Sequence, residues 1–314
     1  MAEAEDRIPV NAKTFQEPLG KLGETIVQKL MREGKNHFNA PASVSDDIAM
    51  MLRYSLSVYR LLFYLNADVR RQTDTDWSIR YGVTAMSLVR SLIDCLFNIT
   101  LILQNPAEKG AAYRKSGMRK TLDDLKEDAQ RYKGETEWES YVSQRRHVVE
   151  RLVRMSGFTE DEVMKQPMWP TMGKYLKSMP PGGVLSEHQE FLKTFTYLGW
   201  RQYSALSHGA YEAFMGTLGH VPVGSYYVED FLPRESRPKV EDSYDVFVST
   251  HIGRAALVLL CTITEIQAYA HFDGANINER ICRIWKALEP LFEGKELYDG
   301  RYAKLMADRG ISRS

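Results

Sequence analysis

The chain has 314 residues, of which 44% are apolar and 26% charged, and this balance excludes an intrinsically disordered protein. Lysine plus arginine and aspartate plus glutamate both number 41, so no overall positive field attracts nucleic acid, and contact with RNA requires a local patch. The three cysteines form no CxxC or Cys/His cluster, which is typical of reduced thiols in the cytosol and predicts neither disulfides nor structural zinc.

The longest apolar run, residues 83–103, is long enough to cross a bilayer but carries Arg90, Asp94 and Asn98. Charges at the centre of a membrane helix are expensive, so we expect this helix to be buried in protein. The N-terminus is polar and acidic and lacks the apolar core of a signal peptide. These features predict a cytoplasmic protein with no membrane partner.

Apolar residues at helical spacing predict helices along most of the chain, and no clear strand pattern appears before residue 218. A charged section, 108–156, is expected to form two amphipathic helices that separate near Gly134. The Pro- and Gly-rich segment PMWPTMGKYLKSMPPGG (167–183) predicts a connector with at most one short helix. The other helices are expected at about 15–33, 44–71, 78–104, 186–216, 243–273, 277–291 and 297–309.

This order predicts an all-α protein, a multi-helix bundle with long core helices and a charged helical insertion. We expect an N-terminal amphipathic helix and linker over 1–43, the bundle over 44–275, and C-terminal helices over 276–314. Within the bundle segment, the insertion occupies about 105–185 and a lid loop about 217–241.

Three of the predicted core helices carry polar stripes on faces that should be apolar. An uncompensated buried charge is costly, so the stripes must either meet one another or face a wet cleft. They are a structural network that fixes how the helices pack, or a shared functional site of ionisable groups. The stripes are Ser87, Arg90, Asp94 and Asn98; Arg201, Ser204, His208 and Glu212; and His251, Arg254 and Glu265.

The second stripe lies in the segment WRQYSALSHGAYEAFM (200–215), where Arg201 and His208 are seven residues apart and almost on one helical face. A metal pair of His208 and Glu212 lacks the other ligands of an HExxH or ferritin-like site, so a metal-dependent hydrolase is a minor alternative. GxGxxG, Walker A and GxSxG are absent. We expect no metal and no other cofactor.

The basic run 144–154 is typical of a solvated helix face. The other interpretation is a phosphate-binding surface, in which Arg145, Arg146 and Arg154 contact a nucleic-acid backbone.

The pattern Arg201-x6-His208 resembles the Arg-x(4–6)-His motif of the HEPN superfamily (higher eukaryotes and prokaryotes nucleotide-binding). Three stretches in order are similar, more narrowly, to a bacterial family of uncharacterised helical proteins linked to that superfamily. They are MSLVRSLIDCLFNITLIL, WPTMGKYL, and the Tyr203-x-x-Leu206-Ser207 helix with its histidine. The resemblance covers roughly residues 45–275.

The resemblance implies a compact helical bundle. Many HEPN proteins are metal-independent endoribonucleases that act as toxins or defence effectors, and others are inactive binding modules. By resemblance, His208 is the general base or acid at a ribose 2′-hydroxyl, Arg201 stabilises the phosphate, and Asp94 orients the pair. RNA as the partner and a homodimer with a composite site are also implied. The candidate substrate-binding residues beside them are Arg90, Tyr203, Ser204, Ser207 and Glu212.

The alternative is a non-enzymatic helical scaffold or protein-interaction module. In that case the Arg, His and Asp side chains form a buried structural network, and the charged insertion and the lid loop bind a protein partner.

Overall fold

The computed structural model describes residues 12–69, 75–178, 190–192, 200–201, 203–204, 240–274, 276–289 and 292–308. Most of these residues are helical, and none of them lies in a strand. The predicted all-α, multi-helix fold is therefore confirmed for the described part of the chain.

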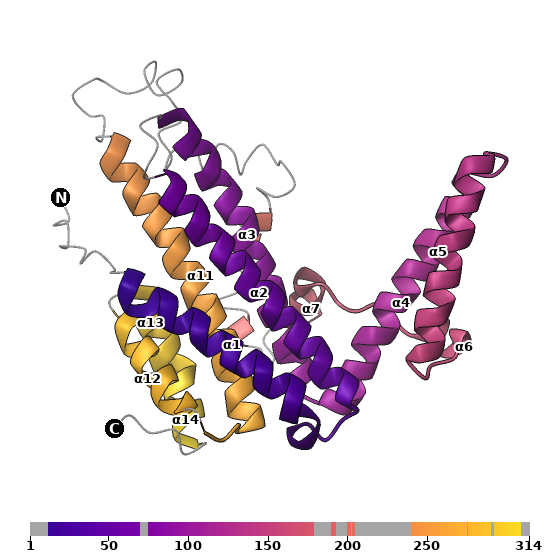
Figure 1. The fold of residues 1–314 in the computed structure, drawn as a ribbon. Helices are drawn as coiled ribbons and strands as arrows, with labels where there is room; N and C mark the ends of the chain where they lie inside the picture. Colours follow the sequence, from indigo (N-terminus) through magenta and orange to yellow (C-terminus); the bar gives the residue numbers. More distant parts are fainter. Residues whose placement is uncertain are drawn as a thin grey trace.

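Four long helices form the core of the bundle (Figure 1). They are α1 (Ala12–His37), α2 (Ala42–Val69), α3 (Thr75–Leu103) and α11 (Val240–Ala270). Helix α2 packs between α1 and α3, and α11 packs against all three. Each helix lies within a few residues of its predicted range, because the apolar residues that define its period also form its buried face.

Two of the core helices contain long apolar stretches, Ala85–Leu103 in α3 and His251–Ala270 in α11. By length and composition alone, both are able to cross a bilayer. The most apolar windows of the two stretches are 67% and 89% buried inside the protein, as is expected of core helices.

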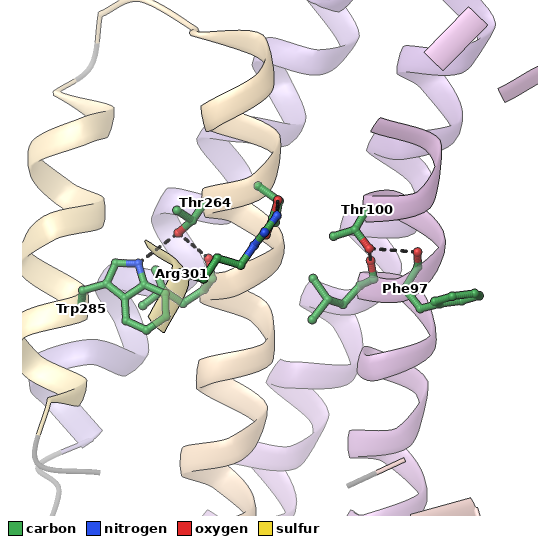
Figure 2. Close-up of polar contacts among 8 residues, drawn as sticks. Phe97, Thr100, Thr264, Trp285 and Arg301 are labelled. Carbon is green, nitrogen blue, oxygen red and sulfur yellow. Dashed lines mark hydrogen bonds and ion pairs between the residues drawn. The ribbon is translucent and has the colours of Figure 1, made fainter. Parts of the chain in front are cut away.

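Buried hydroxyl groups on these helices bond to the backbone of their own helix. Thr100 Oγ1 donates to carbonyl oxygens of the preceding turn of α3, one of which, that of Phe97, lies 3.0 Å away (Figure 2). Thr264 on α11 likewise donates to its preceding turn, and its oxygen accepts a 3.1 Å bond from Trp285 Nε1. Trp285 lies on α12 (Ile277–Leu288), so this bond joins α12 to the core. The hydroxyls of Thr100 and Thr264 thus both have partners, which limits the cost of their burial.

Glu265 of α11 binds the C-terminal helices and not another polar stripe. Arg301 Nε and Nη2 donate to its two carboxylate oxygens at 2.7 and 3.0 Å, and the side chains are only 10% and 8% exposed for Arg301 and Glu265. Of the two interpretations of the stripes, Glu265 follows the structural one, and fourteen residues of helix, about 21 Å, separate it from His251. Arg301 lies in a π-helical turn, η3 (Tyr298–Tyr302), between α13 (Phe292–Leu297) and α14 (Ala303–Asp308).

The charged insertion projects from the bundle as a helical hairpin (Figure 1). Helix α4 (Pro106–Arg131) leads away from the bundle, and α5 (Thr136–Met155) returns beside it. Between them Gly134 adopts a φ of 90°, in the turn where the break is predicted. Two short helices follow, α6 (Glu160–Lys165) and α7 (Met172–Lys177). The hairpin and α6 share a small core of their own, formed by Leu122, Leu125, Val149, Val153 and Val163.

The base of the hairpin is fixed to α2. Arg114 of α4 forms a two-pronged ion pair with Asp47, with Nη2 2.9 Å from Oδ1, and also donates to the backbone oxygen of Ser43 at 3.0 Å. Gly110 packs so closely on Val44 that an added Cβ would lie 2.6 Å from a valine methyl group. Helix α4 is thus attached to the bundle at its first turns and leaves it further along.

We expect Arg301→Ala to lower the free energy of unfolding by about 3–5 kcal/mol, because the variant leaves the buried carboxylate of Glu265 without its counter-charge. The matched control is Arg283→Ala, which breaks an exposed pair with Glu279 on α12 and changes stability by less than about 0.5 kcal/mol. Chemical denaturation of both variants measures the difference. Equal losses would contradict the importance of the buried pair.

Candidate functional site

The polar stripe of α3 is contacted by a tryptophan from the segment that carries the Arg-x6-His pattern. Trp200 Nε1 donates a 2.8 Å hydrogen bond to Asp94 Oδ1. The guanidinium of Arg90 lies over the indole ring, 5.5 Å from its centre, and Arg90 Nε is 3.7 Å from Asp94 Oδ2. The three side chains form one cluster, in which Trp200 contacts both members of the α3 ion pair.

In this cluster the Asp94 carboxylate is more accessible to solvent than the Arg90 guanidinium that pairs with it. The Asp94 side chain is 44% exposed and that of Arg90 is 22% exposed. Burial raises the pKa of Asp94, while the hydrogen bond from Trp200 and the charge of Arg90 act in the opposite direction. Arg90 Nε is buried and makes no hydrogen bond within the described part of the chain. The cluster therefore holds an N–H donor of Arg90 that makes no hydrogen bond within the described residues, beside a carboxylate that is accessible to solvent.

A second tryptophan contacts the same stripe one helical turn further along. Trp169 Nε1 donates to Asn98 Oδ1 at 2.9 Å, and its backbone N–H donates to Ser116 Oγ of α4. Trp169 belongs to the WPTMGKYL segment, in which Thr171 caps α7 by accepting a bond from the backbone of Lys174. Trp169 and Trp200, from two segments far apart in the sequence, thus both bind the polar stripe of α3.

Tyr203, one turn after Trp200, reaches α11 instead of α3. Its hydroxyl oxygen accepts a 2.9 Å bond from Arg254 Nη1 and lies 3.1 Å from His251 Nδ1. An arginine can only donate, so the hydroxyl accepts from Arg254, and its own proton can be donated to His251. Tyr203 is 1% exposed and His251 5% exposed. Trp200 and Tyr203 therefore connect the polar stripe of α3 with that of α11.

His251 is unsuited to proton transfer near neutral pH. Burial, followed by the charge of Arg254, lowers its pKa to about 3. An efficient general acid or base has a pKa close to the working pH. The imidazole is therefore neutral, and its contact with Tyr203 serves to position the segment 200–204.

The structure brings some of the predicted site residues together. Asp94 and Arg90 contact Trp200, and Tyr203 contacts His251. Ser204 is half-buried, and Arg201, the residue after Trp200, is exposed. Of the predicted helix 186–216, only 190–192, 200–201 and 203–204 are among the described residues. Outside them lie Ser207, His208, Glu212 and all of the predicted lid loop but residues 240–241.

Trp200 and Trp169 were not predicted to contribute to the site. The sequence shows aromatic residues around Arg201, but an aromatic side chain in a helix is more often part of the core than a hydrogen-bond donor to a carboxylate. The signal in the sequence was the presence of two tryptophans outside the four long core helices, together with polar residues on a core helix that need partners. The indole N–H is a polar group that needs a partner when it is partly buried.

Within the described part of the chain, no metal centre marks this cluster. Among the described residues, no group of three or more His, Cys, Asp or Glu side chains is placed to hold a metal ion, and all three cysteines are free thiols. A hollow of about 250 Å³ opens elsewhere, between α4 and α5. It is lined by Ala129, Tyr132, Glu139, Val142, Ser143 and Arg146.

No protein-family model, curated protein or solved structure matches the chain. The resemblance to the HEPN superfamily therefore stays a prediction that depends on the residues of the motif. The chemistry of the site has to be argued from its own contacts.

We expect Trp200→Phe to raise the pKa of Asp94 further, because the lost indole N–H stabilises the charged carboxylate. The side-chain carboxyl carbon of Asp94, followed by NMR across a pH titration, gives the value. Trp138→Phe, at an exposed tryptophan of α5, is the control and leaves the titration unchanged. An unaltered Asp94 titration in Trp200→Phe would show that the hydrogen bond is not formed in solution.

The buried His251 makes stability depend on pH. In the unfolded chain its pKa returns to about 6.5, so the unfolded state takes up a proton that the folded state rejects until about pH 3. We expect this residue to lower the free energy of unfolding by about 1.4 kcal/mol per pH unit as the pH falls from 6.5 towards 3.

His251→Gln keeps an acceptor for Tyr203 and removes this titration, so its stability falls less steeply than that of the wild type below pH 6.5. Denaturation curves between pH 7.5 and 4.5 compare the slopes. His147→Gln, at a histidine whose side chain is 79% exposed, should keep the wild-type slope. Parallel curves for wild type and His251→Gln would refute a neutral buried imidazole.

Proposed function

We propose that the protein is a metal-independent endoribonuclease of the HEPN type, acting as a toxin or defence effector. Arg201 and His208 act on the RNA backbone, and Asp94 orients them. The observation that supports this best is the docking of Trp200 on Asp94 and Arg90. It holds the start of the Arg-x6-His segment against an acidic residue of the core helix, as the resemblance requires.

The proposed reaction is an internal transfer within the RNA chain. The base removes the proton of a ribose 2′-hydroxyl, the 2′-oxygen attacks the adjacent phosphorus, and the 5′-oxygen leaves with a proton from the acid. The products carry a 2′,3′-cyclic phosphate and a 5′-hydroxyl. Histidine titrates in the range that this exchange needs, and a guanidinium stabilises the charge on the phosphate oxygens.

Two arginines near Asp94 suit a local phosphate contact in a chain with no net charge. Arg201 is exposed directly after Trp200, and the Arg90 guanidinium, on a side chain that is 22% exposed, lies over the Trp200 ring. A guanidinium presents its donors in a fixed plane that matches the oxygens of a phosphate. We assign both to the RNA backbone, which explains how a neutral protein could bind RNA without an extended basic surface.

A second candidate function is a non-enzymatic helical interaction module. It is favoured by the partners that the polar side chains find inside the fold, since Asp94 is bound by Trp200 and His251 by Tyr203. In this case the cluster fixes the packing of the segment 200–204, and binding takes place elsewhere on the surface.

The deciding experiment is cleavage of labelled total RNA and tRNA in EDTA. We expect discrete cleavage with 2′,3′-cyclic phosphate ends by the wild type, and a loss of at least about 100-fold in His208→Ala, because the general acid or base is removed. His147→Ala, at the exposed histidine of α5, is the matched control and cleaves like the wild type. Melting temperatures of all three proteins confirm that each is folded.

Other outcomes select the alternatives. No cleavage by the wild type, with His208→Ala melting well below it, would make the Arg–His pair part of the scaffold and favour the interaction module. Cleavage that EDTA abolishes and a divalent cation restores would indicate a metal-dependent hydrolase. Cleavage retained in full by His208→Ala would place the catalytic group outside the motif.

A further inference from the structure

Helix α5 carries a row of large apolar side chains that remain about half exposed or more among the described residues. Trp138, Tyr141, Val148, Leu152 and Met155 are between 44% and 73% exposed. They are five of the ten large hydrophobic side chains that are exposed among the described residues. Such a concentration on one helix is typical of an interaction surface and not of scattered apolar residues.

The spacing of these side chains makes them one continuous seam. Together with Arg145 they occupy positions 138, 141, 145, 148, 152 and 155, at alternating intervals of three and four residues. Apolar residues at these intervals line the contact between two helices in a coiled coil. We call these six positions the α5 seam.

Two members of the α5 seam also contact α4 or its end: Arg145 Nη1 lies 3.0 Å from Asp128 Oδ2, and the Trp138 ring stacks on Tyr132. The apolar contact between the two helices uses other residues. Val149 and Val153 lie on another side of α5 and pack against Leu122 and Leu125 of α4. One apolar side is sufficient for a helix to pack on its neighbour, so α5 has a second apolar side. The hairpin projects from the bundle, and its length is accessible to another molecule (Figure 1).

The charges of α5 are divided between its two ends. Glu137 and Glu139 are exposed in its first turn, whereas Arg151 and Arg154 are exposed towards its end, with Glu150 as the acid in that half. A second α5 in parallel would place like charges together. An antiparallel one places the acidic beginning of each helix along the basic end of the other, and such complementarity selects the orientation.

The α5 seam also matches itself in the antiparallel orientation. Its intervals are the same when counted from either end, so each position faces another position of the seam. Trp138 then faces Met155, and Tyr141 faces Leu152. A two-fold axis that relates two copies in this way uses the same surface on both, as most protein dimers do.

We propose that the chain forms a homodimer through the α5 seam, with the two copies of α5 packed antiparallel. The two hairpins then lie side by side, and the tip of each meets the base of the other. The pairing does not depend on the proposed nuclease activity, because it uses the α4–α5 hairpin and no residue of the Asp94 cluster.

The test is the mass of the full-length protein in solution, measured by sedimentation over a range of concentrations. We expect a dimer for the wild type and a dissociation constant raised at least about tenfold in Leu152→Glu, because the change buries a carboxylate in an apolar contact. Leu61→Glu, at a leucine of α2 with 44% exposure against 52% for Leu152, is the matched control and remains dimeric. Both variants should melt close to the wild type.

Disulfide crosslinking tests the orientation. Trp138→Cys mixed with Met155→Cys should crosslink between the two introduced positions, as identified by mass spectrometry, whereas either variant alone should not crosslink to itself. A wild type that stays monomeric, a dimer that Leu152→Glu leaves unchanged, or a crosslink of position 138 to itself would each overturn the proposal. The first two results would assign the α5 seam to a different partner.

Discussion

Helix α11 is enclosed by protein over most of its length, so each polar side chain on it needs a partner inside the fold. This constraint organises the rest of the bundle. Glu265 forms an ion pair with Arg301 of the C-terminal helices. Thr264 accepts a hydrogen bond from the indole of Trp285, and His251 lies within hydrogen-bond distance of the Tyr203 hydroxyl. Segments from three parts of the chain are thereby fixed to one central helix. Polar groups, and not apolar area alone, select which segment packs where.

The segment 200–204 is held at two points that lie one helical turn apart. Trp200 binds the acid of α3, and Tyr203 binds the histidine and arginine of α11. Arg201 lies between these anchors in the sequence and is exposed. A structural role for the network and a functional role for Arg201 are therefore compatible, because the contacts that position a helix also fix the direction of a neighbouring exposed side chain.

The helices and their fold class follow from the sequence, since burial imposes a period of 3.6 residues on each core helix. The polar stripe of α3 was identified in the same way. The partners of the stripes were not, because periodicity indicates which face is buried but not which segment covers it. Glu265 illustrates this limit: its partner, Arg301, lies in a short C-terminal turn with no distinctive pattern of its own. Trp169 likewise comes from a connection, where sequence periodicity carries little information, and the periodicity around the helical Trp200 does not indicate that its indole binds α3.

The rule that explains α11 also distinguishes the hairpin. The stretch His251–Ala270 of α11 is mostly apolar and almost wholly buried, whereas α5 carries exposed apolar side chains beside the side that packs on α4. A contact between two α5 seams would use a helix of twenty residues, which is about 30 Å long, and would place the base of each hairpin at the tip of the other. The bases are where the bundles begin. The hairpin contact therefore holds the two Asp94 clusters apart, and a composite site shared by two subunits would require a second, separate interface on the bundle.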